Sequence, residues 1–272
     1  MQFITSTSNE KIKRTALYSQ KVSARKEDGV FIAEGTKLVI ESPGDKVREI
    51  FISESCLAEL EAKKGSLWER FNELASSLPN DAVIKVSDHV FEKISSQKSP
   101  QGMLAVVETL SYKKEDITKG NPLILVLEEI QDPGNVGTIF RTAEAAGVTG
   151  ILLSEGCADP LSPKVVRSSM GAIFRMPFVI APDLPSAVRD LEKDGIACYA
   201  ARLDAASEYD KCDLASPTAL LIGNEGNGLS VEVTAAASKG IYIPMSGKTE
   251  SLNAAVSASI LSYEAARQRR NK

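Results

Sequence analysis

The sequence predicts an α/β protein in which a mostly parallel sheet follows a smaller α/β domain. From residue 121 onward, unbroken apolar runs of strand length alternate with helix-like segments. This pattern is typical of a parallel sheet covered by helices on both faces. Residues 1–110 mix helix and strand signals, and the polar segment 111–120 separates the two parts. We expect domains at 1–110 and 121–272, joined by a linker at 111–120.

In the first part, residues 9–23 predict a helix because Ile12, Ala16 and Leu17 form a narrow apolar stripe. Short β-branched or apolar runs predict strands, and a longer segment predicts a helical region. The expected strands are 29–33, 48–53 and 103–108, and the expected helical region is 56–78.

In the second part, Gly147 and Gly195 are expected to end helices. The expected strands are 122–128, 150–153, 174–180, 196–200, 218–222 and 241–244. The expected helices are 136–146, 163–169, 184–193, one after Ser230, and 252–269. Ligands of such sheets bind beyond the carboxyl ends of the strands, so the loops there are expected to carry the function.

Composition excludes several classes of protein. The chain has 272 residues, of which 43% are hydrophobic and 25% charged, and this balance favours a globular protein. No apolar run approaches the ~20 residues that span a bilayer, and the N-terminus lacks the apolar core of a signal peptide, so we expect a cytoplasmic protein. Four cysteines without a CxxC pair argue against a zinc ribbon and a disulfide framework, and a single histidine, His89, argues against an HExxH metallohydrolase and most histidine-based catalytic triads. No metal is expected.

Basic residues gather at two places although the net charge is −4. One cluster lies within residues 11–26, and the other ends the chain and includes Lys272. Such clusters can form a local phosphate-binding surface on an acidic background. Charge alone leaves open the alternative that both are solvated helix faces.

The first candidate loop follows the strand at 122–128 and reads EEIQDPGNVGTIFRTAEAAG. The segment 132–134 predicts a turn, and Asn135 is able to cap the next helix. Arg141 and Glu144 are three residues apart and can face one another. Capping with a surface ion pair is the structural alternative.

The second loop, LLIGNEGNGLS at 220–230, has the glycine spacing GxxGxG and not the dinucleotide-binding GxGxxG. Gly247, Lys248 and Thr249 resemble the end of a phosphate-binding P-loop, but Tyr242 stands where that motif needs a glycine. What remains is a turn whose glycines let backbone amides approach a ligand, with Glu225 among them.

The third loop begins IPMSGKTESLN at 243 and leads into a segment with apolar residues at helical spacing. Ser251 is the expected start of this last helix. Small residues at 254, 255, 257 and 258 would let the helix pack closely against a neighbour. By periodicity alone, this is a core helix with a polar first turn.

Taken in this order, the three loops resemble the signature motifs of the SpoU/TrmH family of RNA 2′-O-ribose methyltransferases, within the SPOUT superfamily. The resemblance covers most of residues 121–270. Residues 1–110 resemble, more weakly, the substrate-binding domain of that family, and ISSQKSPQGMLAVVE at 94–108 is typical of its junction region.

The resemblance implies a deep trefoil knot in the second domain, through which the last helix is threaded. It implies that S-adenosylmethionine binds in that knot near Gly223, Ile243, Met245 and Leu252, and that the enzyme is a homodimer. It also implies that Arg141 is the central catalytic residue. A guanidinium stays protonated in proteins, so we expect Arg141 to hold a phosphate beside the target ribose and not to act as a base.

The family match gives orienting roles to the polar residues Asn135, Glu225, Ser251 and Asn253. With a methyltransferase in view, the basic clusters favour RNA contact, and the helix that begins at Pro163 adds Lys164 and Arg167 as further candidates. The expected RNA-binding residues are Lys11, Lys13, Arg14, Arg25, Arg167, Arg267 and Arg269.

The N-terminal domain favours ribosomal RNA of the large (23S) subunit as the substrate, with transfer RNA as the alternative. A non-catalytic RNA-binding protein with the same fold is a rival from another class. A nucleotide-dependent enzyme is disfavoured by the glycine spacing described above.

Overall fold

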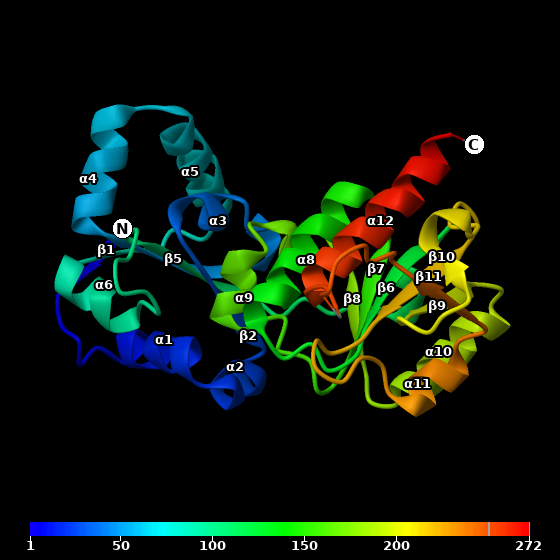
Figure 1. The fold of residues 1–272 in the computed structure, drawn as a ribbon. Helices are drawn as coiled ribbons and strands as arrows, with labels where there is room; N and C mark the ends of the chain where they lie inside the picture. Colours follow the sequence, from blue (N-terminus) through cyan, green and yellow to red (C-terminus); the bar gives the residue numbers. More distant parts are fainter. Residues whose placement is uncertain (250, 272) are drawn as a thin grey trace. The chain divides into compact units, whose positions relative to one another are not determined.

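The computed structural model describes residues 1–249 and 251–271, so Lys272, one of the basic residues at the C-terminus, lies outside the described residues. The chain forms two compact units (Figure 1). Unit 1 consists of Met1–Leu110 and Leu161–Phe174, and unit 2 of Ser111–Pro160 and Arg175–Lys272.

Unit 1 is built on a mixed five-stranded sheet with the strand order β1-β4-β3-β5-β2. β4 is parallel to both of its neighbours, whereas β5 runs antiparallel to β3 and β2. The strands are β1 (Gln2–Ile4), β2 (Val30–Glu34), β3 (Val47–Ser53), β4 (Val83–Val86) and β5 (Met103–Glu108).

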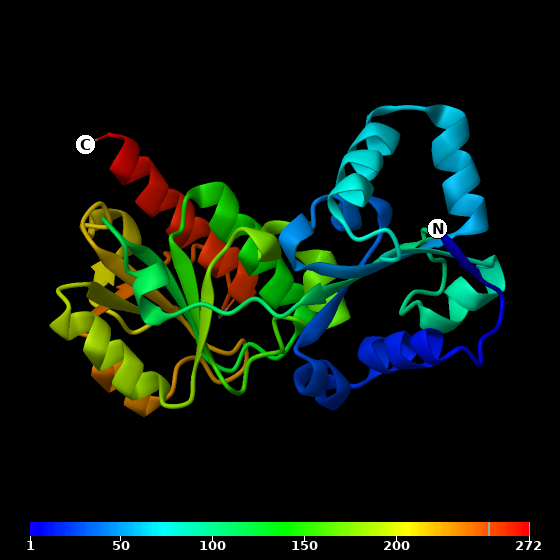
Figure 2. The same ribbon diagram turned by 180° about the vertical axis from the view of Figure 1, so that it is seen from behind.

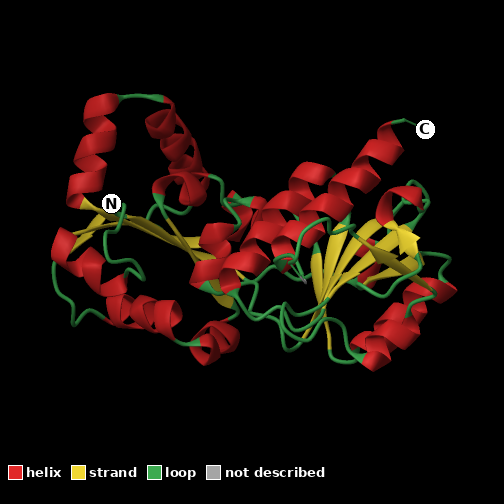
Figure 3. Ribbon diagram, viewed as in Figure 1, coloured by secondary structure: helices red, strands yellow, loops and turns green. Residues whose placement is uncertain are grey.

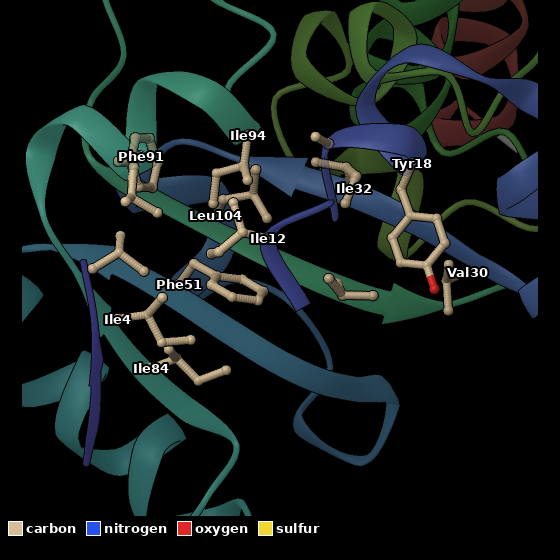
Figure 4. Close-up of a cluster of buried hydrophobic side chains, with 14 residues drawn as sticks. Ile4, Ile12, Tyr18, Val30, Ile32, Phe51, Ile84, Phe91, Ile94 and Leu104 are labelled. Atoms are coloured by element: carbon tan, nitrogen blue, oxygen red, sulfur yellow. The ribbon is translucent and has the colours of Figure 1, made fainter. Parts of the chain in front are cut away.

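Helices cover both faces of this sheet (Figure 1), with α1, α2 and α6 on one face and α3, α4 and α5 on the other. They are α1 (Glu10–Gln20), α2 (Val22–Asp28), α3 (Thr36–Ile40), α4 (Glu54–Lys63), α5 (Ser66–Ser77) and α6 (Asp88–Ile94), with a 3-10 turn at Gly44–Lys46. Figure 4 shows the core between α1, α6 and the strands, where Ile12, Phe91 and Ile94 pack on Phe51 and Leu104. Of the stripe expected on α1, Leu17 is instead 41% exposed.

The segment 161–174 packs with unit 1, although its position in the sequence predicts that it belongs to the second domain. It holds α9 (Pro163–Ser168) and a 3-10 turn, η2 (Ala172–Phe174). The Phe174 ring lies 6.1 Å from that of Phe31 on the edge strand β2, so apolar contact explains the placement. The strand expected at 174–180 accordingly begins only at Phe178.

Unit 2 contains a seven-stranded sheet with the order β10-β12-β9-β11-β6-β7-β8, and every strand pair in it is parallel. The mostly parallel α/β sheet expected from the sequence is confirmed. The strands are β6 (Leu123–Leu127), β7 (Gly150–Ser154), β8 (Phe178–Ala181), β9 (Ala197–Ala201), β10 (Ser207–Glu208), β11 (Thr218–Ile222) and β12 (Lys239–Tyr242).

Helices α8 and α12 lie side by side on one face of this sheet, and α10 and α11 cover the other face (Figures 1 and 3, and from behind Figure 2). The helices are α7 (Lys114–Ile117), α8 (Pro133–Ala146), α10 (Leu184–Lys193), α11 (Val231–Ala236) and α12 (Ala254–Arg270), with a 3-10 turn at Tyr209–Lys211. The segment expected as a linker therefore contains α7, whose Ile117 is fully buried.

Two helix starts differ from the sequence expectation. The cap of α8 is Asp132, which accepts hydrogen bonds from the backbone N–H groups of Gly134 and Asn135. The cap of α12 is Asn253, not Ser251. Both side chains satisfy amides of a first turn, as caps do. Asn135 therefore lies inside α8, with its side chain free for other contacts.

Candidate active site

The loops after β6, β9, β11 and β12 lie at one edge of the sheet because these strands all run in parallel. A pocket of about 890 Å³ opens there, a volume within the range of small-molecule sites. Its lining includes Gly223, Ile243, Met245 and Leu252, which are the four residues expected to bind the cofactor. Glu225 and Ser251 line the same pocket.

The loop after β11 is a tight hairpin whose backbone closes on itself. Asn224 donates its N–H to the Gly228 carbonyl at 3.1 Å, and Gly228 donates to the Asn224 carbonyl at 2.8 Å. A Cβ at Gly223 would lie 2.2 Å from the Gly228 carbonyl carbon, so only glycine fits there. The Asn224 side chain donates to the Glu129 carbonyl at 2.9 Å, which fixes this hairpin to the end of β6.

A buried carboxylate holds the far side of the same loop. Glu128 is 9% exposed and accepts hydrogen bonds from the Ser230 N–H at 2.8 Å and the Ser230 hydroxyl at 2.6 Å. Ser230 also caps α11. Glu128 was not predicted as a supporting residue, although its position at the end of a buried strand was an available signal.

The three loops meet through a chain of side-chain hydrogen bonds. Asn135 on α8 donates its amide N–H to the Glu225 carboxylate, and Asn253 donates to the Asn135 amide oxygen at 3.1 Å. The Asn253 oxygen at the same time caps α12. Asn135 and Asn253, which are 118 positions apart in the sequence, are thus joined. Glu225, at one end of this series of hydrogen bonds, lines the pocket.

Arg141 lies on α8 and is exposed. It makes no hydrogen bond or ion pair with another described residue, and it is not among the residues that line the pocket. Glu144, which the spacing allowed to face Arg141, instead binds Arg175 through both carboxylate oxygens. The Arg141 guanidinium is therefore available to a ligand.

The basic residues of unit 1 have different environments. Lys11, Lys13 and Arg14 are partly exposed, and each pairs with an acid: Glu49, Glu10 and Asp28 respectively. Arg25 is only 4% exposed and donates to the Tyr18 carbonyl at 3.0 Å. We therefore remove Arg25 from the expected RNA contacts, because a buried guanidinium cannot reach a phosphate.

The remaining expected RNA contacts lie on α9 and α12. Arg167, on α9, is half-buried and has no ion pair with a described residue. Arg267 pairs with Glu264 through two hydrogen bonds. Arg269 donates to four backbone carbonyls, those of residues 121, 122, 214 and 216, and burial lowers its pKa. Arg269 fastens the end of α12 to the sheet, so we also remove it from the RNA contacts.

No three His, Cys, Asp or Glu side chains among residues 1–249 and 251–271 form a group that can hold a metal ion. Nor does the described part of the chain contain a helix long and apolar enough to cross a membrane.

A parallel sheet with a small-molecule pocket and a set of polar hydrogen bonds at its carboxyl edge defines an α/β protein with a ligand-binding site at the usual place for this fold. The SpoU rRNA Methylase family matches residues 122–263, and an MRM3-like substrate binding domain matches residues 9–105. The chain belongs to the SpoU rRNA methylase family. It is a methyltransferase that uses S-adenosylmethionine.

Individual relatives match over nearly the whole length. The 23S rRNA (guanosine(2553)-2′-O)-methyltransferase RlmP of Bacillus subtilis is 31% identical over 97% of this chain and 98% of its own. The AdoMet-bound rRNA methyltransferase from Sinorhizobium meliloti has a TM-score of 0.84 at 30% identity, over 98% of this chain and 97% of its own. The SpoU methyltransferase AviRb from Streptomyces viridochromogenes, in complex with AdoMet, has a TM-score of 0.83 at 26% identity, over 96% and 98%.

Proposed function

We propose that the protein transfers a methyl group from S-adenosylmethionine to the 2′-hydroxyl of a ribose in large-subunit (23S) ribosomal RNA. The observation that carries this proposal is the hydrogen-bond chain Glu225–Asn135–Asn253, which joins the three motif loops at the edge of the pocket. The relative named RlmP supports ribosomal RNA as the substrate.

The pocket suits this cofactor in size and chemistry. Apolar side chains such as Leu229, Leu252 and Leu261 line it together with the backbone of the glycine hairpin, so it offers both a face for a ring and polar groups for its edges. We assign cofactor binding to Gly223, Ile243, Met245 and Leu252. When bound, S-adenosylmethionine supplies a methyl group already activated by its sulfonium, so the protein's task is alignment and charge stabilisation.

Arg141 is the proposed catalytic residue. Its guanidinium is exposed and has no partner among the described residues, and it stays protonated at any physiological pH. It would hold a phosphate beside the target ribose and stabilise negative charge as the hydroxyl loses its proton. Asn135, Glu225, Ser251 and Asn253 would orient the nucleotide and the methyl donor, because the amide–carboxylate chain fixes the three loops.

The proposal includes the wider organisation of the molecule. Residues 1–110 would bind RNA, 111–120 would connect, and 121–272 would carry out methyl transfer. Lys11, Lys13, Arg14, Arg167 and Arg267 remain the proposed RNA contacts. A trefoil knot, a homodimer and a cytoplasmic location remain predictions, and the family membership supports the knot.

Incubation of the purified protein with labelled S-adenosylmethionine and total RNA tests the proposal. We expect label in large-subunit ribosomal RNA, at one nucleotide whose 2′-O-methylribose survives alkaline hydrolysis of the flanking chain. Label in transfer RNA would establish the alternative substrate. Label on a base, or cofactor binding without transfer to any RNA, would contradict the proposal.

A further inference from the structure

Unit 1 contains a second cavity that the methyl-transfer site does not use. It has a volume of about 360 Å³ and lies between α1, the end of α2, and strands β3 and β5. Its charged and polar lining comprises Lys11, Arg14, Thr15, Tyr18, Asp28, Arg48 and Glu49. We call this the α1–β3 cavity. Its size is at the low end of the roughly 300–1,000 Å³ of small-ligand sites.

A network of three side chains forms one wall of the cavity. Arg14 binds the Asp28 carboxylate through Nε, at 2.9 Å, and through Nη2. The Tyr18 hydroxyl donates to the same carboxylate at 2.5 Å and accepts from Arg14 Nε at 2.8 Å. Hydrogen bonding from Arg14 lowers the pKa of Asp28, and burial raises the pKa of Tyr18. Asp28 and Arg14 are therefore both charged at neutral pH, and Tyr18 is neutral.

The opposite wall comes from α1 and β3. Lys11 Nζ lies 2.5 Å from Glu49 Oε1. Arg48 donates through Nη1 to the Asp28 carbonyl at 3.0 Å and through Nε to Glu108 at 3.3 Å. Three cations from two different elements are thus held in fixed positions around one cavity.

Two of the three cations are more exposed than the acids that hold them, whereas Arg48 is as exposed as its partner Glu108. The Arg14 side chain is 64% exposed and its partner Asp28 18%, and Lys11 is 40% exposed and its partner Glu49 26%. At these two pairs, the cations lie toward the mouth of the cavity and the carboxylates of Asp28 and Glu49 lie deeper. A lysine has three N–H donors and an arginine five, so the contacts among the described residues leave several donors unused on all three cations.

Stability does not account for this arrangement, because exposed ion pairs contribute little to folding. A nucleotide matches it, since a phosphate would meet the cations at the mouth while N–H groups of the base point toward the carboxylates below. A concave site of this size takes one nucleotide turned out of a strand, and unstacked nucleotides are what proteins read in RNA. A duplex would present only its convex backbone.

We propose that the α1–β3 cavity binds one nucleotide of a single-stranded segment of the substrate RNA, with the phosphate on Lys11, Arg14 and Arg48. Arg48 is an RNA contact that no sequence pattern predicted. The inference rests on the proposed function only in taking RNA as the ligand.

Binding of a short, fluorescein-labelled, single-stranded RNA of random sequence, measured against salt concentration, tests the proposal. The double variant Lys11→Gln/Arg48→Gln should bind about tenfold more weakly and lower the salt slope by about 0.7, the contribution of the one phosphate that the cavity no longer neutralises. Lys63→Gln is the matched control, because Lys63 is an exposed lysine of α4 that pairs with Glu59 in the same unit and does not line the cavity. An unchanged slope in a folded double variant would overturn the proposal.

A second measurement needs no variant. RNA containing 4-thiouridine, irradiated with the unmodified full-length protein, should crosslink to peptides of α1 and β3 because the base lies inside the cavity. Crosslinks confined to other elements of unit 1 would overturn the proposal. Methyl transfer measured in parallel separates the two proposals. If only the cavity is misassigned, the unmodified protein methylates RNA and the double variant has the same KM for it; if the proposed function is wrong, RNA binding and crosslinking remain measurable without transfer.

Discussion

The two units each hold a cavity, but the cavities are built from different groups. The pocket in unit 2 is lined by a glycine hairpin and by apolar side chains such as Leu229 and Leu252. The α1–β3 cavity in unit 1 is made of charged side chains that hold one another in place. The first arrangement suits a ligand of fixed shape, and the second suits a flexible, charged polymer.

The difference between the two cavities also explains why one of them leaves a motif in the sequence and the other does not. A site with a glycine hairpin as one wall needs glycines at fixed spacings, and so leaves a linear motif such as GNEGNG at 223–228. A site made of side chains draws on scattered positions: Lys11, Arg14, Asp28, Arg48 and Glu49 come from three elements. No local pattern marks such a set, so it appears only once the chain is folded.

The largest effect is expected at Arg141. Replacing it with alanine should lower the rate of methyl transfer at saturating substrates by about 100-fold or more, the loss typical of a group that stabilises transition-state charge. Affinity for S-adenosylmethionine should stay unchanged because Arg141 does not line the pocket. Single-turnover kinetics and calorimetric titration measure the two quantities. Arg189→Ala, at an exposed arginine of α10, is the control. Normal turnover in Arg141→Ala would remove Arg141 from the mechanism.

A smaller effect, on the cofactor alone, is expected at Gly223. An alanine Cβ would lie 2.3 Å from the Gly228 carbonyl oxygen, so the hairpin must open and the pocket wall must shift. We expect affinity for S-adenosylmethionine to fall about tenfold, equivalent to about 1.4 kcal/mol. Gly65→Ala, where a Cβ meets nothing within 4 Å, controls for the general effect of adding a methyl group. Equal cofactor affinity in both variants would show that the hairpin does not shape the pocket.

Substitutions at Asn253 can separate its role as a helix cap from its role in the active site. Asn253→Asp keeps an oxygen that caps α12 but loses the N–H that binds Asn135, so the loops lose one connection while the helix keeps its cap. We expect an unfolding temperature close to that of the original protein and turnover lowered about tenfold.

Asn253→Ala provides the comparison, because it removes both roles and should also lower stability by about 1 kcal/mol. Thermal unfolding and steady-state kinetics measure the two effects. If Asn253→Asp turns over normally, the hydrogen bond to Asn135 is not needed for the reaction.

The parallel sheet and the motif loops were predictable because long apolar strands and spaced glycines are strong local signals. The elements that were not predicted have weak local sequence signals. β1 and β4 are short edge-side strands with polar neighbours, and α3 has only five residues. The extent of unit 1 was also hidden, because the contact between Phe31 and Phe174 joins segments far apart in the sequence.

For site residues, the sequence could not predict which side chains pair with one another. Spacing placed Glu144 opposite Arg141, but Arg175 provides two N–H groups at the right geometry and binds it instead. The charge pattern likewise grouped Arg25 and Arg269 with the exposed basic residues. Only the fold shows that one is buried and the other binds backbone carbonyls.

The smallest effect is expected in unit 1, where the free energy of unfolding should depend on pH in the acid range. The pKa of Asp28 lies below its ordinary value of 3.8, chiefly because Arg14 donates hydrogen bonds to it and secondly because Tyr18 does. A lowered pKa in the folded state means that the unfolded chain binds more protons in this range, so stability rises with pH there. The contribution of Asp28 is therefore present above 3.8 and is lost as the pH falls through the lower, folded-state value.

Replacing Asp28 with asparagine should remove that contribution. The difference in free energy of unfolding between the original protein and Asp28→Asn should be constant from pH 7 to about pH 5 and should shrink below it. Arg14 stays charged throughout, and Tyr18 titrates only at alkaline pH, so neither changes the sign. Urea unfolding at several pH values measures the difference, with Glu61→Gln, at an exposed carboxylate of α4, as the control. A difference that grows toward low pH would mean that Asp28 is not held charged by Arg14, and the fixed cations inferred at the mouth of the α1–β3 cavity would lose their support.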